Sequence, residues 1–247
     1  MHHSNPVTML TLTAHLLGEE RTIHPVLLRD GDSAALVDAG YPGQLPLLEQ
    51  ALRDSGVSLQ QLTAVIVTHQ DIDHIGGLPG LLQAAPNPLE VLAHPFEQPF
   101  IEGRQTLLKF SGDALKDIDS WPEEMSAPFK RLLANPPRAD VTGLLLGGET
   151  LPYGGGVTVI PTPGHTPGHI SLYHPVSKTL IAVDALIIED GELQISPPSL
   201  TWDMQAAIQS VRELCRYDIE TVICYHGGLY AGNASERLRE LAMLPAQ

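Results

Sequence analysis

The feature that most constrains this chain is the hexapeptide His69-Gln70-Asp71-Ile72-Asp73-His74, which places two imidazoles and two carboxylates within one turn. An apolar, β-branched run at residues 64–67 precedes it, and Gly76-Gly77 follows it. This pattern predicts a buried strand that ends in a polar cluster and then a glycine-containing turn. Histidine nitrogen and aspartate oxygen are ligands that Zn, Mn and Fe accept. We therefore expect a metal site here rather than a solvated loop.

Three later stretches repeat this arrangement, in which an apolar strand ends and a metal-competent residue follows. They contain His165 and His169 in a Pro/Gly-rich loop, Asp184 after residues 180–183, and His226 after residues 222–225. Strand ends at one edge of a layered sheet are where sites assemble. A single His or Asp at a strand end is more often a capping or hydrogen-bonding residue. The presence of four such ends in one chain favours a metal centre.

The rest of the chain alternates strand-like and helix-like segments, which favours an α/β layered fold. Neither a linker nor an aligned repeat divides it, so we predict a single domain over residues 1–247. Hydrophobic periodicity predicts strands at 8–17, 25–28, 34–37, 63–67, 90–93, 157–160, 170–173, 179–183 and 220–224, and helices at 44–54, 78–84, 203–217 and 234–244.

The segment 102–140 has a different character from its surroundings. Its apolar residues are scattered among charges, and prolines at 122, 128, 136 and 137 interrupt short amphipathic helices. A helical insertion that covers a pocket and a helical layer packed on a sheet account for this pattern equally well.

The charge balance restricts the partners of the chain. It has 14 Lys+Arg against 29 Asp+Glu, a net charge of -15, whereas nucleic-acid binding rests on a basic surface. No apolar stretch approaches the ~18 residues of a membrane span, and the N-terminus lacks the pattern of a signal peptide. We expect a cytoplasmic protein with a small-molecule substrate and neither a nucleic-acid nor a membrane partner. A homodimer is compatible with the sequence.

The order and spacing of the motifs resemble those of the metallo-β-lactamase superfamily of metal-dependent hydrolases. The resemblance runs from Val37-Asp38-Ala39-Gly40 through the hexapeptide and the loop Gly164-His165-Thr166-Pro167-Gly168-His169 to Asp184 and His226-Gly227. The chain looks most similar to compact hydrolases of the glyoxalase II and acyl-homoserine-lactone lactonase type. This resemblance implies a four-layer αβ/βα sandwich with a two-metal centre at the edge of the sheets and, around 102–140, the helical insertion.

The resemblance also implies a role for each residue of the motifs. Asp38 and His169 match residues that support the ligands, and Asp73 and Asp184 are the predicted catalytic residues. The first cation position is expected to take His69, Asp71 and His165, the second to take Asp73, His74 and His226, and Asp184 to bridge both, with a water or hydroxide between the ions.

Asp71 departs from the family pattern, which has histidine at this place. An aspartate is a shorter, harder and anionic ligand, so it shifts the preference from a purely zinc site towards Mn, Fe or a mixed pair. We expect Asp71 to bind the cation; if it does not, the first position is weak or empty. The expected cofactors are two divalent metal ions, with zinc first and Mn or Fe as the alternatives.

The implied activity is hydrolysis of an ester, lactone or thioester, in which the hydroxide between the ions attacks the carbonyl. A flavodiiron-like redox protein is an alternative, since those relatives also carry a carboxylate at the place of Asp71, but they are fused to a flavin domain. A phosphodiesterase and a non-catalytic binding protein are two further alternatives. Tyr225 and Tyr230 are weak candidates for the general acid, and ordinary packing roles explain them better.

Overall fold

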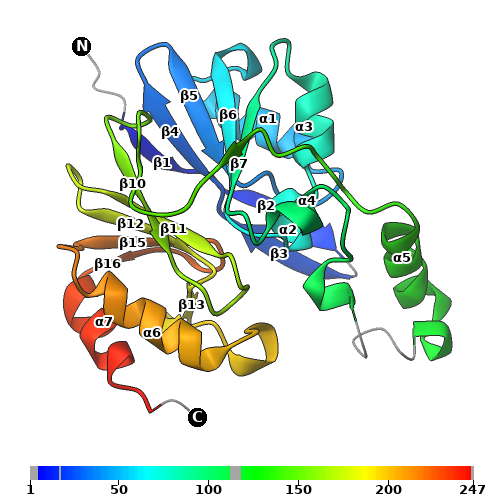
Figure 1. Ribbon diagram of the computed structural model, residues 1–247. Helices are drawn as coiled ribbons and strands as arrows, with labels where there is room; N and C mark the ends of the chain where they lie inside the picture. The colour runs from blue at the N-terminus through cyan, green and yellow to red at the C-terminus, as the bar shows by residue number, and fades with distance from the viewer. Residues whose placement is uncertain (1–4, 17, 112–117, 246–247) are drawn as a thin grey trace.

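Two six-stranded sheets lie face to face in the computed structural model, which describes residues 5–16, 18–111 and 118–245 (Figure 1). The first sheet is built, in spatial order, from β1 (Val7–Met9), β4 (Val26–Asp30), β5 (Ser33–Val37), β6 (Leu62–Val67), β7 (Glu90–Ala93) and β8 (Gly143–Leu144). The second is built from β16 (Gly228–Ala231), β15 (Thr221–Cys224), β12 (Thr179–Val183), β11 (Ile170–His174), β10 (Val157–Pro161) and β9 (Thr150–Leu151).

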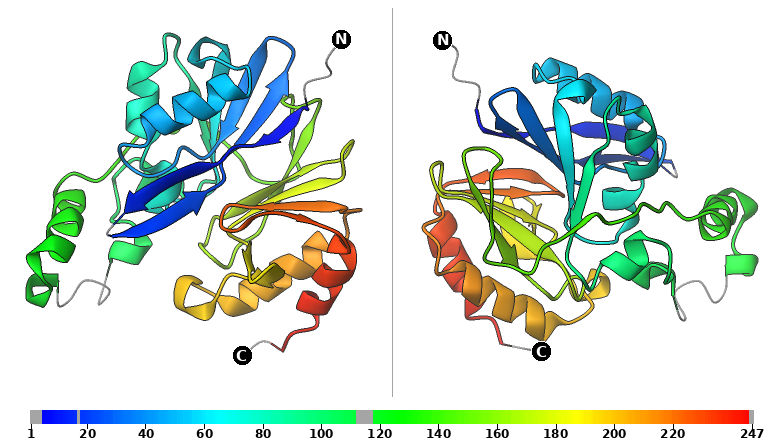
Figure 2. Two further views of the ribbon diagram at one scale, coloured as in Figure 1. Left: turned by 180° about the vertical axis from the view of Figure 1, so that it is seen from behind. Right: turned by 45° about the horizontal axis from the view of Figure 1, so that its top comes forward.

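Helices cover the outer face of each sheet (Figure 2). On the first sheet lie α1 (Leu45–Asp54) and α3 (Leu78–Ala84), and on the second lie α6 (Met204–Leu214) and α7 (Ala234–Ala242). In α1 the buried residues Leu48 and Leu52 are four apart, so they share one face of the helix. None of the helices in the described residues combines the length and apolar character that a membrane span needs. The two sheets with helices on their outer faces confirm the predicted four-layer α/β sandwich.

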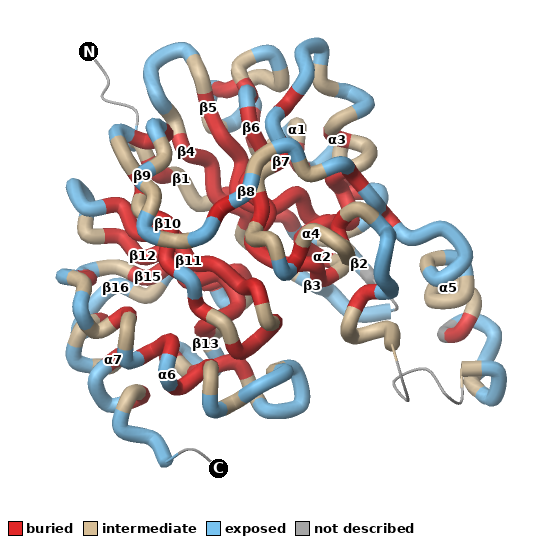
Figure 3. The backbone as a smooth tube through the Cα atoms, in the orientation of Figure 1, coloured by how far each residue is buried: buried red, intermediate tan, exposed pale blue. Residues whose placement is uncertain are grey.

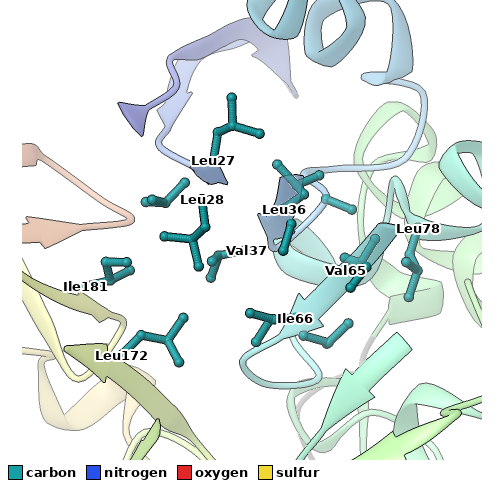
Figure 4. Close-up of a cluster of buried hydrophobic side chains, with 14 of the residues drawn as sticks. Leu27, Leu28, Leu36, Val37, Val65, Ile66, Leu78, Leu172 and Ile181 are labelled. Atoms are coloured by element: carbon teal, nitrogen blue, oxygen red, sulfur yellow. The ribbon is translucent and has the colours of Figure 1, made fainter. Parts of the chain in front are cut away.

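The main hydrophobic core lies between the two sheets. Leu28, Val37 and Ile66 of the first sheet belong to the same buried cluster as Leu172 and Ile181 of the second (Figure 4). Strands of a sheet covered on both faces are apolar on both faces, and β6 fits this rule because its last four residues are all buried (Figure 3). A second cluster joins the outer face of the second sheet to α6 and α7.

Parallel strand pairs deliver the polar motifs to one place. β5 runs parallel to β6 in the first sheet, and β12 runs parallel to β15 in the second. The carboxyl ends of parallel strands meet at one edge of a sheet, so the residues that follow them gather there. The amide of Ile170 donates to the carbonyl of Thr68 at 3.3 Å, which joins the two sheets at this edge. The following residues are Asp38 after β5, His69 after β6, Asp184 after β12 and His226 after β15.

An irregularity in β12 precedes Asp184. The pairing of β12 with β15 shifts register between Ile181 and Val183, and Val183 has a φ of 55°. A β-branched residue rarely adopts this left-handed conformation, so the backbone is strained there. A bulge of this kind redirects the next side chain, which here is the carboxylate of Asp184.

The segment expected as a helical insertion has two distinct parts. The first part ends in η2 (Leu108–Phe110), which lies close to the strand ends, and residues 112–117 fall outside the described residues. The second part contains η4 (Ile118–Ser120) and α5 (Glu123–Ala134), and α5 lies beside the body of the molecule, away from both sheets (Figures 1 and 2). Phe129 of α5 contacts Phe110 and Trp121 edge to face, with ring centroids 6.1 and 5.7 Å apart. Helix α5 therefore forms neither a cover over the site nor a layer on a sheet.

Several short strands differ from the prediction. The strand predicted over 8–17 is divided into β1 and β2 (Leu12–Leu16), because β1 pairs with β4 whereas β2 pairs with β3 (Glu19–Ile23). The hairpin of β13 (Leu186–Glu189) and β14 (Glu192–Ile195) was not predicted, nor was β16. The dipeptide Asp190-Gly191 is the sequence signal for such a hairpin. In the structure both residues have a positive φ, 51° and 80°.

Replacing Gly77 by alanine tests how closely the turn after the hexapeptide packs against the rest of the fold. A Cβ at Gly77 would lie 2.1 Å from the backbone oxygen of Ala39, so the chain would have to move. We expect Gly77→Ala to lower the free energy of unfolding by about 1–3 kcal/mol, measured by denaturant or thermal unfolding.

Gly80→Ala is the matched control, because Gly80 lies inside α3 and its nearest neighbour for a Cβ is 3.9 Å away. Alanine is the better helix former, so this change should be neutral or stabilising. Equal stability losses in the two variants would contradict the packing argument.

Candidate metal centre

Four buried side chains form the first group of the site. The potential ligand atoms of His69, Asp71, His165 and Asp184 all lie within 4.8 Å of one another. Oδ2 of Asp71 is 3.3 Å from Nε2 of His69 and 2.9 Å from Nε2 of His165. The hexapeptide supplies two of these residues, and the loop between β10 and β11 supplies the third. This group contains every ligand predicted for the first cation position.

The second group consists of Asp73, His74, Asp184 and His226, with ligand atoms within the same 4.8 Å limit. Asp73 and His74 belong to the short helix α2 (Ile72–Ile75), which begins directly after Asp71. Nε2 of His226 lies 3.1 Å from Oδ2 of Asp73, and the side chain of His226 is 38% exposed. This group contains every ligand predicted for the second position.

Asp184 lies between the two groups. Its Oδ2 is 3.8 Å from Nε2 of His69 and 3.5 Å from Nε2 of His165, both in the first group. The same oxygen is 3.3 Å from Nε2 of His74 and 3.5 Å from Nε2 of His226, both in the second group. One carboxylate oxygen therefore faces four imidazoles, which is the arrangement expected for a bridging ligand.

Unpaired polar atoms indicate that the donor set suits divalent cations. Nε2 of His69, Nε2 of His74 and Oδ1 of Asp184 are buried and lack a hydrogen-bond partner. Burying a polar atom without a hydrogen-bond partner costs about 1–3 kcal/mol of folding free energy, so these atoms call for a bound ligand between them. Ligand atoms on one tetrahedral cation at ~2.1 Å lie roughly 3.4 Å apart, which matches the spacing here. The residues fit two cations, although metal binding by the seven predicted ligands stays a prediction.

Asp38 supports the ligands through hydrogen bonds. Its Oδ2 is 2.8 Å from Nδ1 of His74, which leaves Nε2 of that ring facing the site. The same carboxylate accepts from the backbone amide of Thr68 at 2.9 Å and from its hydroxyl at 2.7 Å. Asp38 therefore fixes both the start of the hexapeptide and its last histidine, as expected for a carboxylate that orients a metal ligand.

His169 belongs to neither ligand group. Its Nδ1 lies 2.8 Å from the hydroxyl of Thr162, and its Nε2 accepts from the backbone amide of Asp184 at 3.2 Å. Burial lowers the pKa of His169 well below its usual value, and the neighbouring imidazoles lower it further. The ring therefore acts as a neutral acceptor that holds the backbone of Asp184.

Tyr225 has a structural position beneath the second group. Its hydroxyl donates to the backbone carbonyl of Asp73 at 2.6 Å, and its ring stacks on His74 with centroids 3.9 Å apart. Tyr230 packs against the cluster between the second sheet and α6 and α7. These contacts favour the packing roles and leave the general acid unassigned.

Glu97 is an organising residue that the sequence did not indicate. It lies directly before α4 (Gln98–Ile101) and is fully buried. Its Oε2 accepts from the backbone amide and the side-chain amide of Gln70, both at 3.0 Å. Its Oε1 accepts from the hydroxyl of Thr166 at 2.8 Å and the amide of Gly168 at 2.7 Å. Glu97 therefore ties the hexapeptide to the loop that carries His165.

Lys109 is a second residue that the sequence did not indicate. Its ammonium forms an ion pair with Asp71 and lies 3.2 Å from Nε2 of His165. Burial alone would raise the pKa of Asp71, but the hydrogen bond from His165, the nearby imidazole of His69 and the charge of Lys109 hold it well below its usual value. Asp71 is therefore an anion, as metal binding requires.

A cavity of about 140 Å³ opens beside the first group. Asp71, Lys109 and His165 line its inner end. The segment 199–202, which includes the exposed side chains of Leu200 and Trp202, lines its outer part. The cavity gives a small molecule access to the first group.

The comparisons with known proteins agree with this geometry. The family model described as the metallo-beta-lactamase superfamily matches residues 19–226. The chain belongs to the metallo-beta-lactamase superfamily. Its superfamily relatives include a probable metallo-hydrolase, YflN, from Bacillus subtilis, which is 29% identical over 85% of this chain and 81% of that protein. A hydroxyacylglutathione hydrolase from Cupriavidus taiwanensis is 32% identical over 58% of this chain and 40% of that protein.

A solved structure shares the superfamily fold. The metallo-beta-lactamase family protein TTHA1429 from Thermus thermophilus superposes with a TM-score of 0.70. The alignment covers 96% of this chain and 78% of that chain at 24% sequence identity. The match of the family model confirms the predicted superfamily, whereas similarity to the glyoxalase II type in particular stays a prediction.

Proton release upon metal binding tests the electrostatics of the second group. Burial lowers the pKa of His226, but Asp184 and Asp73 raise it more strongly, to about 10. The carboxylates likewise raise the pKa of His74 well above its usual value, against the effect of burial. Both imidazoles therefore carry protons at neutral pH in the metal-free protein, and a cation must expel them.

We expect the apparent metal affinity to rise between about pH 6 and 9, roughly tenfold per pH unit for each proton released. Calorimetric titrations in buffers of different ionisation enthalpy count the protons. An affinity that stays constant over this range would contradict the charge assignment.

Proposed function

We propose that this protein is a hydrolase that uses two divalent cations to cleave an ester, lactone or thioester of a small molecule. The observation that carries the proposal is the pair of four-residue groups that share Asp184, the first of which adjoins a cavity. Zinc is the first expectation for the cations. The carboxylate of Asp71 favours Mn or Fe at the first position more than a histidine would.

The chemistry divides between the cations and the chain. Two bound divalent ions would supply an acidified water molecule and polarise a carbonyl oxygen. The chain holds the imidazoles in fixed orientations through Asp38, Glu97 and their hydrogen bonds. The carboxylates of Asp73 and Asp184 lie within the same cluster, so they can accept hydrogen bonds from the attacking water and orient it. No serine or cysteine nucleophile is needed.

The shape and charge of the molecule support a small acyl substrate. Leu108, Leu200 and Trp202 give the cavity apolar walls that suit an acyl chain or a lactone ring. The net charge of -15 disfavours a nucleic-acid phosphodiester, because binding of a polyanion rests on a basic surface. The similarity to a protein named hydroxyacylglutathione hydrolase supports a carbonyl substrate.

Replacing Asp184 by asparagine tests the proposed function. The purified protein is stripped of metal, reloaded with Zn, Mn or Fe(II), and assayed against lactones, thioesters, aryl esters and phosphodiesters. Loss of the shared anion should weaken both cation positions. We expect Asp184→Asn to lower kcat/KM for the best carbonyl substrate more than about 100-fold.

Asp218→Asn is the matched control, since Asp218 is an exposed aspartate that pairs with Lys178 on the surface. It should leave turnover and thermal stability unchanged. Undiminished hydrolysis by a folded Asp184→Asn variant, or turnover of phosphodiesters alone, would overturn the proposal.

A further inference from the structure

A lysine contacts one ligand group but not the other. The ammonium of Lys109 pairs with Asp71 and lies 3.2 Å from Nε2 of His165, so it engages two of the four residues of the first group. Within the described residues, no ion pair joins a lysine or arginine to Asp73 or Asp184 of the second group. The two cation positions therefore differ in their local charge.

The position of Lys109 is built into the fold. The backbone amide of the preceding residue, Leu108, donates to Oε1 of Gln70 at 2.7 Å. Gln70 is the second residue of the hexapeptide and is held in turn by two hydrogen bonds to Glu97. The following residue, Phe110, packs against the main core. The chain is thus anchored on both sides of Lys109, next to Asp71.

The negative charge of the first group is balanced by the ammonium of Lys109. Asp71 adds a third carboxylate to those of Asp73 and Asp184, and it is buried where water cannot screen its charge. A lysine, with an ordinary pKa near ~10.4, is protonated at neutral pH and balances this carboxylate. In the metal-free protein the ammonium of Lys109 therefore neutralises the carboxylate of Asp71, as a bound metal ion would.

We propose that Lys109 competes with the metal ion for the ligands of the first position and thereby weakens metal binding there. A cation that binds Asp71 and His165 has to displace the ammonium from both. The cavity offers the displaced side chain a place beside Thr166, Ser199 and Thr201, still close to the first position. The positive charge then continues to oppose the cation. This inference rests on the metal-binding part of the proposed function and not on hydrolysis.

Metal titration of charge variants tests the proposal without any assay of activity. Metal-free wild-type protein is titrated with Zn²⁺ and with Mn²⁺ by calorimetry, and a chromophoric chelator is used where binding is tight. We expect two binding steps, one for each position. Lys109→Met and Lys109→Gln should tighten the step of the first position about 10–100-fold and leave the other step unchanged.

Three further variants separate charge from packing and identify the steps. Lys109→Arg keeps the charge and should retain the wild-type affinities. Lys178→Met is the matched control, since Lys178 pairs with Asp218 and Glu220 on the surface, far along the chain from the hexapeptide. His226→Ala should remove the step of the second position, and the remaining step should still tighten when Lys109→Met is added.

The outcomes distinguish this proposal from the proposed hydrolysis. An unchanged or weakened first position in folded Lys109→Met and Lys109→Gln variants would overturn the competition. Tightening in Lys109→Arg equal to that in Lys109→Met would also overturn it, since the charge would then be irrelevant. The expected change in affinity in a protein that hydrolyses none of the tested carbonyl compounds would support Lys109 as a competitor and overturn only the substrate class.

Discussion

The site depends on one electrostatic constraint. The carboxylate of Asp184 is buried among four imidazoles, and its negative charge has to be balanced by positive charge within that cluster. Burial makes an unpaired carboxylate costly, while the surrounding imidazoles also leave buried nitrogen atoms without partners. Protons on His74 and His226 and the ammonium of Lys109 provide positive charge in the metal-free protein. Two divalent cations would satisfy the same demand more completely, which is the reason why we propose a metal centre here.

The two-sheet architecture meets this constraint because it brings strand ends together from distant parts of the chain. The hexapeptide leaves the first sheet after β6, and Asp184 leaves the second sheet after β12. The rigid core between the sheets, together with the hydrogen bonds of Asp38 and Glu97, holds these ends in register. Ligands on such a frame are oriented before a cation arrives, so little ordering remains to oppose binding. The apolar core between the sheets thus positions the polar residues at their edge.

The sequence predicted the sandwich and the residues that converge, because an apolar run followed by His or Asp records both a strand and its end. It did not indicate the bulge at Val183, whose left-handed backbone is imposed by the pairing of β12 with β15. It also missed Glu97 and Lys109, since their roles arise from contacts with residues 27 and 38 positions or more away in the chain. The position of α5 beside the body, rather than over the site, follows from tertiary packing that periodicity does not encode.

The most direct measurement of the central claim is a crystal structure of the metal-loaded protein, with anomalous diffraction recorded on both sides of the absorption edge of the metal. We predict two anomalous peaks about 3.5–4 Å apart, a spacing typical of two-metal sites, with Asp184 in contact with both. One peak lies against Asp71 and His165, and the other against Asp73 and His226. A single peak remote from Asp184, or none in protein saturated with metal, would contradict a two-metal centre that shares Asp184.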